Sequence, residues 1–305
     1  MNKFLLENIR CPDCYSRLTS EINLIKCLKC HMEYLIVSKK LILVSKDNEL
    51  FPVENYINAS KNKNNYLLSK IKSAVPEISV NLSQKKMLYK FKKIIEKRKN
   101  YKLLVLGCGN QRKDVLSIFD SDKNIIFTDI SLETECDIII DCHNIPFEDK
   151  SFDGIIITAV LEHVYDPEDV VKSIHRVLKD HGIVYSEIPF MQQIHEGAYD
   201  FTRYSMVGHN KLFHHFKLID YGLVAGPGSV LAWSIENFIK AFFNKNTLRN
   251  FSILVSRILF FWLKYFDYFF QINKKSLDGA SCTYVLAEKI NRISSKKEIM
   301  NTYNN

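Results

Sequence analysis

Short apolar runs recur along the chain from residue 101 onward, separated by amphipathic or polar stretches. The first runs are KLLVLG, NIIFTD, CDIIID and FDGIIIT, and each ends near a polar residue. IVYSEIPF, HFKLIDYGLV and SCTYVLAEK follow farther along the chain. Runs of this length are typical of buried β-strands. We therefore expect these segments to form the strands of one sheet.

One amphipathic stretch, residues 166–182, carries the signals of a helix at both ends. Asp166 is the expected cap, Pro167 takes the first turn and Asp169 completes a pair that resembles a capping box. Gly182 is expected to end the helix. Its apolar face comprises Val170, Val171, Ile174, Val177 and Leu178. Strands that alternate with helices predict an α/β fold with a parallel, doubly wound sheet, whose ligand binds at the carboxyl ends of the strands.

The first hundred residues divide into two parts. In residues 1–50 the segment MEYLIVSKKLILVS has a polar break between two apolar halves, which predicts a hairpin. Residues 51–100 contain NASKNKNN, a polar linker, and then a lysine-rich helix. The apolar face of that helix is Met87, Leu88, Phe91, Ile94 and Ile95. We expect its lysines to be the solvated face of the helix rather than a nucleic-acid patch.

A helical insertion, about 229–275, separates the last two predicted strands. It contains NFSILVSRILFFWLKYFDYFFQ, in which polar residues recur every seven positions at Asn250, Arg257, Lys264 and Gln271. The charged residues Arg257, Lys264 and Asp267 argue against a membrane-spanning helix. Two interpretations remain for 251–270. The helix packs on the core or on a partner subunit, or it lies in a membrane interface with its aromatic side chains among the lipid headgroups.

The composition places the chain among reduced globular proteins. It has 305 residues, a hydrophobic fraction of 47% and a net charge of +8, which permits a nucleic acid or an anionic membrane as partner. The opening MNKFLLENIR does not fit a signal peptide, since Glu7 and Arg10 interrupt its apolar run. Eight cysteines in such a chain indicate free thiols. We expect a cytoplasmic protein, with possible peripheral contact at the inner face of the membrane.

Four of the cysteines form two CxxC pairs with twelve residues between them: Cys11, Cys14, Cys27 and Cys30. Two such turns can place four thiolates around one tetrahedral Zn²⁺, and four protein ligands leave no position open for a substrate. We therefore expect a structural zinc ion, and the segment resembles zinc-ribbon modules. A redox role usually needs only one such pair. The other cysteines are interpreted as buried small residues: Cys108, Cys136, Cys142 and Cys282.

A glycine bend follows the first strand of the sheet, at Gly107-Cys108-Gly109. Glycines occur where the backbone turns sharply and a ligand approaches it closely. About twenty residues later Asp129 ends the next strand, where an acidic side chain can bind ribose hydroxyls. Asp141 ends the strand after that, beside Cys142 and His143, where it could accept a hydrogen bond from an adenine amine. Capping of the strand ends is the alternative for both carboxylates.

The residues after the bend indicate which nucleotide binds. A dinucleotide needs the full GxGxxG pattern to seat its pyrophosphate on a helix N-terminus. Here Gly109 is followed by Asn110, Gln111 and Arg112, which do not fit that pattern. A ligand with ribose and adenine but without phosphate fits better, and S-adenosylmethionine is such a ligand.

The segment IPFEDKSFDGI, followed by LEHV and HRVLK, resembles the class I S-adenosylmethionine-dependent methyltransferases of the type 11-like group. The resemblance covers residues 101–290, with 291–305 as a polar tail. It implies a Rossmann-like, mostly parallel seven-stranded sheet whose last strand is antiparallel. The segments PFMQQIHEGAYDFTRY and GLVAGPGSVLAW resemble a subgroup associated with bacterial surface-polysaccharide gene clusters. Zinc ribbons are also appended to several methyltransferases and to methyltransferase activator proteins.

The resemblance also assigns roles to single residues. Gly107, Cys108 and Gly109 face the methionine part of the cofactor, and Asp129 binds ribose. Asp141 and Cys142 lie near adenine, and Glu162 and His163 flank the methyl donor. The sequence departs from the family's pattern at two positions: Val105 replaces the usual acidic residue, and Gln111 replaces the third glycine.

The substrate is expected on the loop after IVYSEIPF, which leaves the carboxyl end of a central strand. An alcohol acceptor must lose its proton, so a positioned histidine or carboxylate is expected there. His195 is the first choice for the base, with Glu196 or Asp200 orienting it, and His163 is the second. Further residues are expected to contact the substrate: Tyr199, Arg203 and Tyr204. The alternative is that Asp200 and Arg203 form a structural ion pair and His195 only lines the pocket.

Three functions fit these patterns. The leading hypothesis is O-methylation of a sugar in a surface polysaccharide or a lipid-linked glycan precursor, with segment 251–270 docking to the membrane. The second is an RNA methyltransferase that uses the zinc ribbon to bind its substrate; against it, the strand FDGIIIT precedes AVLEHV rather than an NPPY-like motif. The third is a non-catalytic assembly subunit that binds the cofactor, which the missing third glycine permits.

Overall fold

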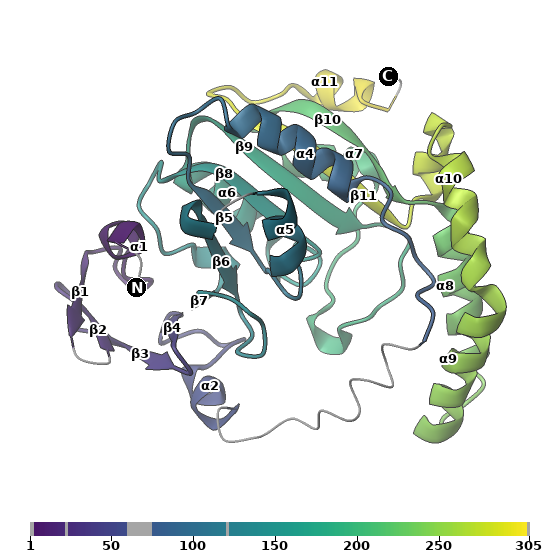
Figure 1. Ribbon diagram of the computed structural model, residues 1–305, viewed down its shortest axis with the longest axis horizontal. Helices are drawn as coiled ribbons and strands as arrows, with labels where there is room; N and C mark the ends of the chain where they lie inside the picture. Colours follow the sequence, from purple (N-terminus) through teal and green to yellow (C-terminus); the bar gives the residue numbers. More distant parts are fainter. Residues whose placement is uncertain (1–2, 22–23, 60–74, 120–121, 304–305) are drawn as a thin grey trace.

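A single sheet forms the centre of the molecule (Figure 1). The computed structural model describes residues 3–21, 24–59, 75–119 and 122–303. In these ranges the sheet has eleven strands, in the order β1-β2-β3-β4-β7-β6-β5-β8-β9-β11-β10. Their bounds are β1 Leu18–Glu21, β2 Leu24–Cys27, β3 Glu33–Val37, β4 Lys40–Leu43, β5 Leu103–Leu106, β6 Ile125–Asp129, β7 Ile138–Ile140, β8 Phe152–Thr158, β9 Leu178–Pro189, β10 Phe216–Ala225 and β11 Cys282–Lys289.

Strands β5 to β11 come from the apolar runs that the sequence analysis identified. Strands β7, β6, β5, β8 and β9 run parallel to one another, whereas β11 runs antiparallel to both β9 and β10. The resemblance implied seven strands, and the described sheet is longer. The difference arises because β4 pairs in parallel with β7, from Leu41 opposite Ile138 to Leu43 opposite Ile140. The N-terminal strands thereby cover what would otherwise be an open sheet edge.

Alternate side chains of the central strands enter two hydrophobic cores. Leu104 and Leu106 of β5 pack on the side that α1 and α6 cover, and Leu103 and Val105 pack on the side of α4 and α5. The helices of the described chain are α1 Lys3–Asn8, α2 Val53–Ala59, α4 Gln84–Ile95, α5 Arg112–Ile118, α6 Pro167–Val177, α7 Met206–Leu212, α8 Pro227–Lys240, α9 Asn246–Phe260, α10 Asp267–Phe270 and α11 Lys296–Asn301. Short 3₁₀ helices occur at η1 Asp122–Asn124, η2 Cys142–Asn144, η3 Gly197–Tyr199, η4 Phe261–Phe266 and η5 Lys274–Gly279.

Several predicted local elements are confirmed. The hairpin after the second thiol pair is β3–β4, in which Val37 lies opposite Lys40. The lysine-rich helix is α4, which buries Met87, Leu88, Phe91 and Ile95. Of the predicted linker, residues 60–65 lie outside the described residues, and its first two residues belong to α2. The polar tail contains α11, whose first turn is stabilised by a capping box of Ser295 and Glu298.

The helix predicted at residues 166–182 is shorter than expected. Its start is confirmed: the Asp166 side chain accepts a hydrogen bond from the Asp169 N–H, and Pro167 is the first helical residue. The helix ends at Val177, however, because Leu178 has extended backbone angles and begins β9 opposite Phe152. Leu178 and Gly182 therefore belong to the strand. A leucine at helical spacing is equally suited to a buried strand start, which local pattern alone does not distinguish.

The long insertion is a helical hairpin at one end of the molecule rather than one straight second helix (Figure 1). After α8, the chain forms α9, then the 3₁₀ segment η4, then α10. The break is stabilised by Asp267, a buried residue whose carboxylate accepts hydrogen bonds from Gly226, Gly228 and Ser229 at the start of α8. An aspartate at a helix N-terminus satisfies unpaired N–H groups and opposes the helix dipole. Within the described residues, no helix is both long and apolar enough to cross a membrane.

Candidate functional site

The glycine bend connects β5 to α5 at the carboxyl edge of the sheet, and its two glycines have different roles. Both have left-handed backbones, with φ of +63° at Gly107 and +47° at Gly109. A Cβ atom on Gly107 would lie 2.2 Å from Cγ2 of Val160, so this glycine is required by packing. A Cβ atom on Gly109 would meet nothing within 4 Å. The backbone at Gly109 therefore faces open space, as a bend that receives a ligand must.

Asp129 lies directly beside this bend. One of its carboxylate oxygens accepts a hydrogen bond of 2.8 Å from the Gly109 N–H, and the other accepts one of 2.9 Å from the Ser131 N–H. These bonds orient the carboxylate toward the bend and leave lone pairs for a ligand, because each oxygen can accept more than one hydrogen bond. The position agrees with the ribose-binding role expected of Asp129, which stays a prediction.

Asp141 has partners within the protein for both of its oxygens. One accepts from the N–H and the imidazole of His143, at 2.9 and 2.7 Å, and the other accepts from the Asn48 amide at 2.6 Å. Burial alone would raise the pKa of Asp141, but these hydrogen bonds outweigh it and lower the pKa. Asp141 thus caps the start of η2, which is the alternative that the sequence left open. Cys142 beside it is buried.

Sequence reasoning missed a tyrosine that faces both carboxylates. Tyr56 of α2 is buried, and its hydroxyl has no hydrogen-bond partner among the described residues. Burial is the main cause that raises the pKa of Tyr56, and the charges of Asp141 and Asp129 raise it further. A buried hydroxyl without a hydrogen-bond partner is unfavourable unless a ligand supplies that hydrogen bond. Tyr56 lies thirteen residues after the end of β4 at Leu43, and nothing in its neighbourhood in the sequence marks it as a ligand contact.

Glu162, His163 and His195 meet at the base of the predicted substrate loop. The three residues each offer one ligand atom, and these atoms lie within 4.8 Å of one another. Glu162 is fully buried, neither of its carboxylate oxygens has a hydrogen-bond partner, and burial raises its pKa to about 8. Burial also lowers the pKa of His163. The structure therefore brings together both histidines that the sequence proposed as bases.

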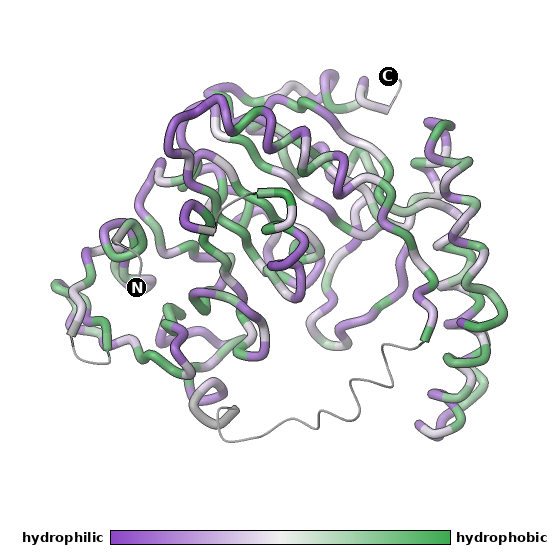
Figure 2. Tube along the Cα trace, in the orientation of Figure 1, coloured by the Kyte–Doolittle hydropathy of each residue, from purple (hydrophilic) through white to green (hydrophobic). Residues whose placement is uncertain are grey.

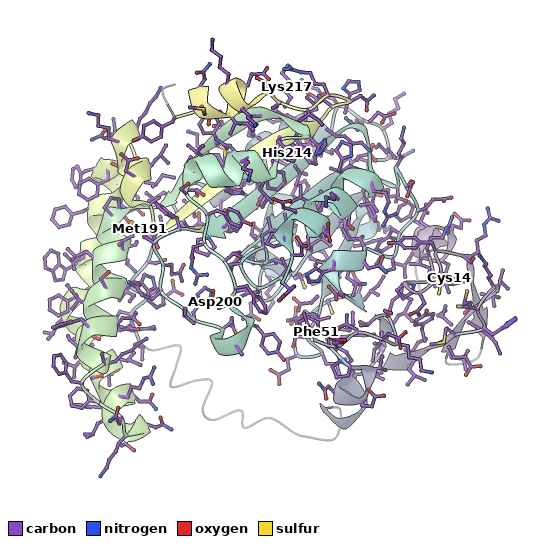
Figure 3. All side chains as sticks on the ribbon, turned by 180° about the vertical axis from the view of Figure 1, so that it is seen from behind. Cys14, Phe51, Met191, Asp200, His214 and Lys217 are labelled. Atoms are coloured by element: carbon purple, nitrogen blue, oxygen red, sulfur yellow. The ribbon has the colours of Figure 1, made fainter. Side chains whose placement is uncertain are left out.

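Asp200, rather than Glu196, is the carboxylate next to His195. It accepts a hydrogen bond of 2.9 Å from the His195 N–H and lies 3.5 Å from the imidazole Nδ1 (Figure 3 labels Asp200). Burial acts to raise the pKa of Asp200, but hydrogen bonds from Arg203 and His195 outweigh it and hold the pKa at about 2. Asp200 is therefore ionised at neutral pH and lies beside the imidazole of His195, whereas Glu196 is exposed.

Arg203 and Tyr204, which the sequence analysis expects to contact the substrate, both make contacts within the protein. The five N–H groups of the Arg203 guanidinium all have acceptors, namely the two oxygens of Asp200 and backbone carbonyls of Gln192, Gln193 and Thr202. This is the structural ion pair that the sequence analysis gave as the alternative. Tyr204 packs against a hydrophobic core. Tyr199 is exposed and stacks on Phe51, with ring centroids 5.7 Å apart.

A second buried carboxylate, Glu187, was also missed. It accepts hydrogen bonds from the hydroxyl of Tyr185 and, at 3.2 Å, from the amide of Asn81, and burial raises its pKa to about 7. Glu187 stands in the apolar run IVYSEIPF. A lone acidic residue inside a buried strand was the signal that could have found it, because buried charges are rare without a partner.

The four thiols of the CxxC pairs lie together, far from this site in the sequence. Their sulfurs lie within 4.8 Å of one another, with 3.6 Å between Cys11 and Cys30 and 3.4 Å between Cys14 and Cys27 (Figure 3 labels Cys14). Sulfurs bound tetrahedrally to Zn²⁺ at about 2.3 Å lie roughly 3.8 Å apart. The Cys27 sulfur also accepts N–H groups from Lys29 and Cys30, at 3.4 and 3.5 Å. The cluster therefore fits a zinc ion.

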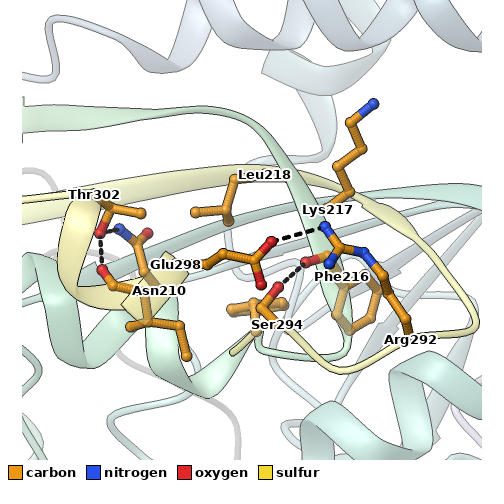
Figure 4. A pocket seen from close by; sticks show the side chains of 10 residues that line it. Asn210, Phe216, Lys217, Leu218, Arg292, Ser294, Glu298 and Thr302 are labelled. Carbon is orange, nitrogen blue, oxygen red and sulfur yellow. Dashed lines mark hydrogen bonds and ion pairs between the residues drawn. The ribbon is translucent and has the colours of Figure 1, made fainter. Parts of the chain in front are cut away.

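Figure 4 shows a separate cavity, of about 170 Å³, between α7, β10 and the C-terminal segment. Its lining includes Asn210, which donates to Thr302, and Arg292, which pairs with Glu298. It lies away from the carboxyl ends of the strands and contains none of the residues of the candidate site.

Comparison with known proteins identifies a domain. The family described as a methyltransferase domain matches residues 104–186. This segment runs from β5 into β9, so it includes the glycine bend, Asp129, Glu162 and His163. No curated protein matches the chain.

Solved structures with a similar arrangement include the cyclase SpnF, which is 14% identical over 73% of this chain and 92% of that chain, with a TM-score of 0.42. Coclaurine N-methyltransferase bound to N-methylheliamine and SAH is 14% identical over 67% of this chain and 72% of that chain, with a TM-score of 0.40. Phosphoethanolamine N-methyltransferase 2 of Haemonchus contortus, in complex with S-adenosyl-L-methionine, is 15% identical over 67% of this chain and 52% of that chain, with a TM-score of 0.40.

Proposed function

We propose that this chain, whose residues 104–186 match a methyltransferase domain, is an S-adenosylmethionine-dependent methyltransferase that methylates a sugar hydroxyl of a surface polysaccharide or of a lipid-linked glycan precursor. The observation that carries the proposal is a surface of exposed aromatic and aliphatic side chains on the insertion, here called the aromatic surface. It consists of Phe238, Phe242, Phe251, Ile258, Leu259, Trp262, Tyr265, Phe266, Phe269 and Ile272. Figure 2 shows apolar residues recurring along these helices.

The cofactor is proposed to lie over the glycine bend. The carboxylate of Asp129 accepts hydrogen bonds from the ribose hydroxyls, and the unpartnered hydroxyl of Tyr56 forms a further hydrogen bond with the same ligand. The backbone of Gly109 borders the methionine part, where it has open space. Bound S-adenosylmethionine supplies an electrophilic methyl group on its sulfonium sulfur. The residues of the chain must align the acceptor with that methyl group and keep water away.

Replacing Gly109 with alanine is expected to weaken S-adenosylmethionine binding at least tenfold, because the new methyl group enters the space reserved for the ligand. Gly197→Ala is the matched control. Gly197 also has a positive φ, +58°, with nothing within 4 Å of its Cβ position, so it incurs the same backbone strain of about 1 kcal/mol. Calorimetric titration of both variants makes the test. Equal affinities in the two variants would contradict the placement of the cofactor at Gly109.

His195 is the proposed base for the acceptor hydroxyl. Its Nδ1 lies 3.2 Å from the Gln193 carbonyl, which leaves Nε2 free to take a proton. Asp200 stabilises the imidazolium that forms. As the hydroxyl oxygen bonds to the methyl carbon, the carbon–sulfur bond breaks and its electron pair stays on sulfur. Positioned bases of this kind contribute about 10²–10⁴ in rate.

The aromatic surface supports a membrane-bound acceptor. The insertion has a small buried apolar cluster, in which Ala232 and Leu263 pack with Ile78, and its α9 contacts α8 through the ion pair of Arg257 with Glu236 at 2.6 Å. The larger apolar side chains of the aromatic surface face outward. Exposed basic residues flank it: Lys245, Arg249, Lys274 and Lys275. Such an arrangement suits an anionic membrane interface.

The substrate loop is hydrogen-bonded to α8, the helix that also carries Phe238 of the aromatic surface. The Gln193 amide donates a 3.1 Å hydrogen bond to the Ser234 hydroxyl of α8. A glycan whose lipid anchor is held in the membrane under α8–α10 would therefore approach the loop that carries His195. The lysines of α4 give less support to RNA as the substrate, because Lys90 forms an ion pair with Asp220 and Lys92 forms one with Glu96.

The proposal is tested by incubating the protein with labelled S-adenosylmethionine and, separately, cell-envelope glycolipids and RNA. Label is expected in the glycolipid fraction. A variant with Phe266→Ser and Phe269→Ser is expected to lose binding to anionic vesicles and to lose at least tenfold in transfer to the lipid-linked acceptor. Label in RNA would replace the proposal with the second function, and cofactor binding without any transfer would favour the non-catalytic subunit.

We also propose that the four thiols bind a structural zinc ion. The ion would join the CxxC turns of the N-terminal unit, whose β4 completes the sheet edge and whose Asn48 holds Asp141. Because four protein ligands fill the coordination sphere of Zn²⁺, this ion takes no part in catalysis. Its presence is measured in the metal titration described below.

A further inference from the structure

Glu162, His163 and His195 form a second group of metal-ligating side chains, distinct from the four thiols. We propose that they bind a divalent transition-metal ion, which holds the acceptor hydroxyl beside the methyl donor. Two imidazoles and one carboxylate are a ligand set typical of such ions, whereas Mg²⁺ and Ca²⁺ prefer oxygen ligands alone.

The first argument is the state of Glu162. The residue is fully buried, and both of its carboxylate oxygens lack a hydrogen-bond partner. Its backbone is held in place, because its carbonyl accepts hydrogen bonds from the N–H groups of Phe201 and Thr202. A buried carboxylate with no partner is strongly unfavourable, and a bound cation removes that penalty. Glu187, by contrast, is buried with its hydrogen bonds made.

The second argument is the orientation of the two imidazoles. Nδ1 of His163 lies 2.8 Å from the Tyr199 carbonyl, and Nδ1 of His195 lies 3.2 Å from the Gln193 carbonyl. Each ring therefore carries its proton on Nδ1 and leaves Nε2 unprotonated. Histidines that bind metals almost always donate their other ring N–H to a carbonyl or carboxylate in this way.

The third argument is distance. Nε2 of His163 lies 3.6 Å from Oε1 of Glu162, and the ring centroids of the two histidines are 4.9 Å apart. Ligand atoms around a tetrahedral ion at about 2.1 Å lie roughly 3.4 Å apart, so small side-chain adjustments close the site. His195 is exposed, so the ion and an acceptor have access from that side.

Three protein ligands leave coordination positions open, as in catalytic rather than structural sites. An acceptor hydroxyl bound there becomes more acidic and releases its proton to solvent. The resulting oxygen attacks the methyl carbon, the carbon–sulfur bond breaks, and the electron pair remains on sulfur. This role of the ion rests on the proposed methyl transfer, whereas binding of the ion does not. Since His195 Nε2 cannot be both ligand and base, His195 acts as the base proposed above only in protein that holds no ion at this site.

The test is a titration of metal-free protein with Co²⁺, followed by absorption. Wild-type protein is expected to bind two equivalents: one with the thiolate-to-cobalt charge-transfer bands of the four-cysteine site, and one without them. Glu162→Gln and His195→Asn should each weaken the second equivalent on the order of 100-fold or more and leave the thiolate bands unchanged. Glu187→Gln is the control for loss of a buried carboxylate and should retain both equivalents.

Wild-type protein that binds Co²⁺ only with thiolate bands would overturn the site without any variant having to fold. A second equivalent that survives in both Glu162→Gln and His195→Asn would overturn it as well. Either result leaves His195 available as the base. If the second equivalent is present but no acceptor is methylated, the proposed function fails while the metal site stands.

Discussion

Asp129→Asn is expected to weaken S-adenosylmethionine binding by about 100-fold or more while the fold is retained. The Asp129 carboxylate holds the Gly109 N–H at 2.8 Å and, in the proposed complex, accepts hydrogen bonds from two ribose hydroxyls. Hydrogen bonds to charged groups contribute about 1.5–3 kcal/mol each, and 1.4 kcal/mol is about tenfold in affinity. An amide has the same shape but no charge, and only its oxygen accepts. Calorimetric titration measures the loss.

Asp137→Asn is the matched control for this variant. Asp137 also accepts a backbone N–H, from Phe127 at 2.8 Å, but it directly precedes β7 and its other oxygen pairs with Arg112. It has no place in the proposed cofactor site. The control should lose stability as Asp129→Asn does and keep its affinity for the cofactor. Unchanged affinity in Asp129→Asn would refute the ribose assignment.

Asp267→Ala is expected to destabilise the insertion by about 3–5 kcal/mol, the largest effect we expect on stability. The carboxylate accepts hydrogen bonds from three backbone N–H groups at the start of α8 and one from the Ser229 hydroxyl, all in a buried environment. Alanine leaves these donors without acceptors, and each buried unsatisfied group costs about 1–3 kcal/mol. Partial relaxation of the helix end reduces the sum.

Urea unfolding followed by tryptophan fluorescence measures this loss locally. The chain has two tryptophans, Trp233 in α8 and Trp262 in η4, and both report on the insertion. Asp278→Ala is the control, because Asp278 accepts only an exposed hydrogen bond from Tyr303 and should change stability by less than about 0.5 kcal/mol. If Asp267→Ala unfolds within 1 kcal/mol of wild type, the N-terminus of α8 does not depend on this carboxylate.

The order of strands and helices between residues 101 and 290 followed from local pattern. Runs such as FDGIIIT are almost entirely apolar because β8 is buried on both faces. Such a run can be predicted as a strand without tertiary information. The glycine bend could also be predicted from the sequence. Gly107 and Gly109 require positive φ angles, and glycine is the residue that adopts them with least strain. Asp129 was found because it ends a strand at a typical distance from the bend.

Contacts between segments far apart in the sequence could not be predicted from local pattern. Tyr56 precedes Asp129 by more than seventy residues, and the pairing of β4 with β7 brings the N-terminal unit to the cofactor edge. Likewise, whether Arg203 is available to a substrate depended on how the loop folds, and Asp200 and nearby carbonyls take all of its N–H groups. Local pattern says which groups exist but does not say which of their hydrogen bonds are already made.

The sequence by itself determined the elements, the two CxxC pairs, the glycine bend and the acidic strand ends, because these depend on backbone preference and spacing over a few residues. The tertiary structure decided that Glu162 is buried without a partner beside two histidines, and that the insertion turns Arg257 and Asp267 inward. Both facts arise from long-range packing. Burial of a side chain depends on what the rest of the chain places around it, and a linear pattern does not specify that.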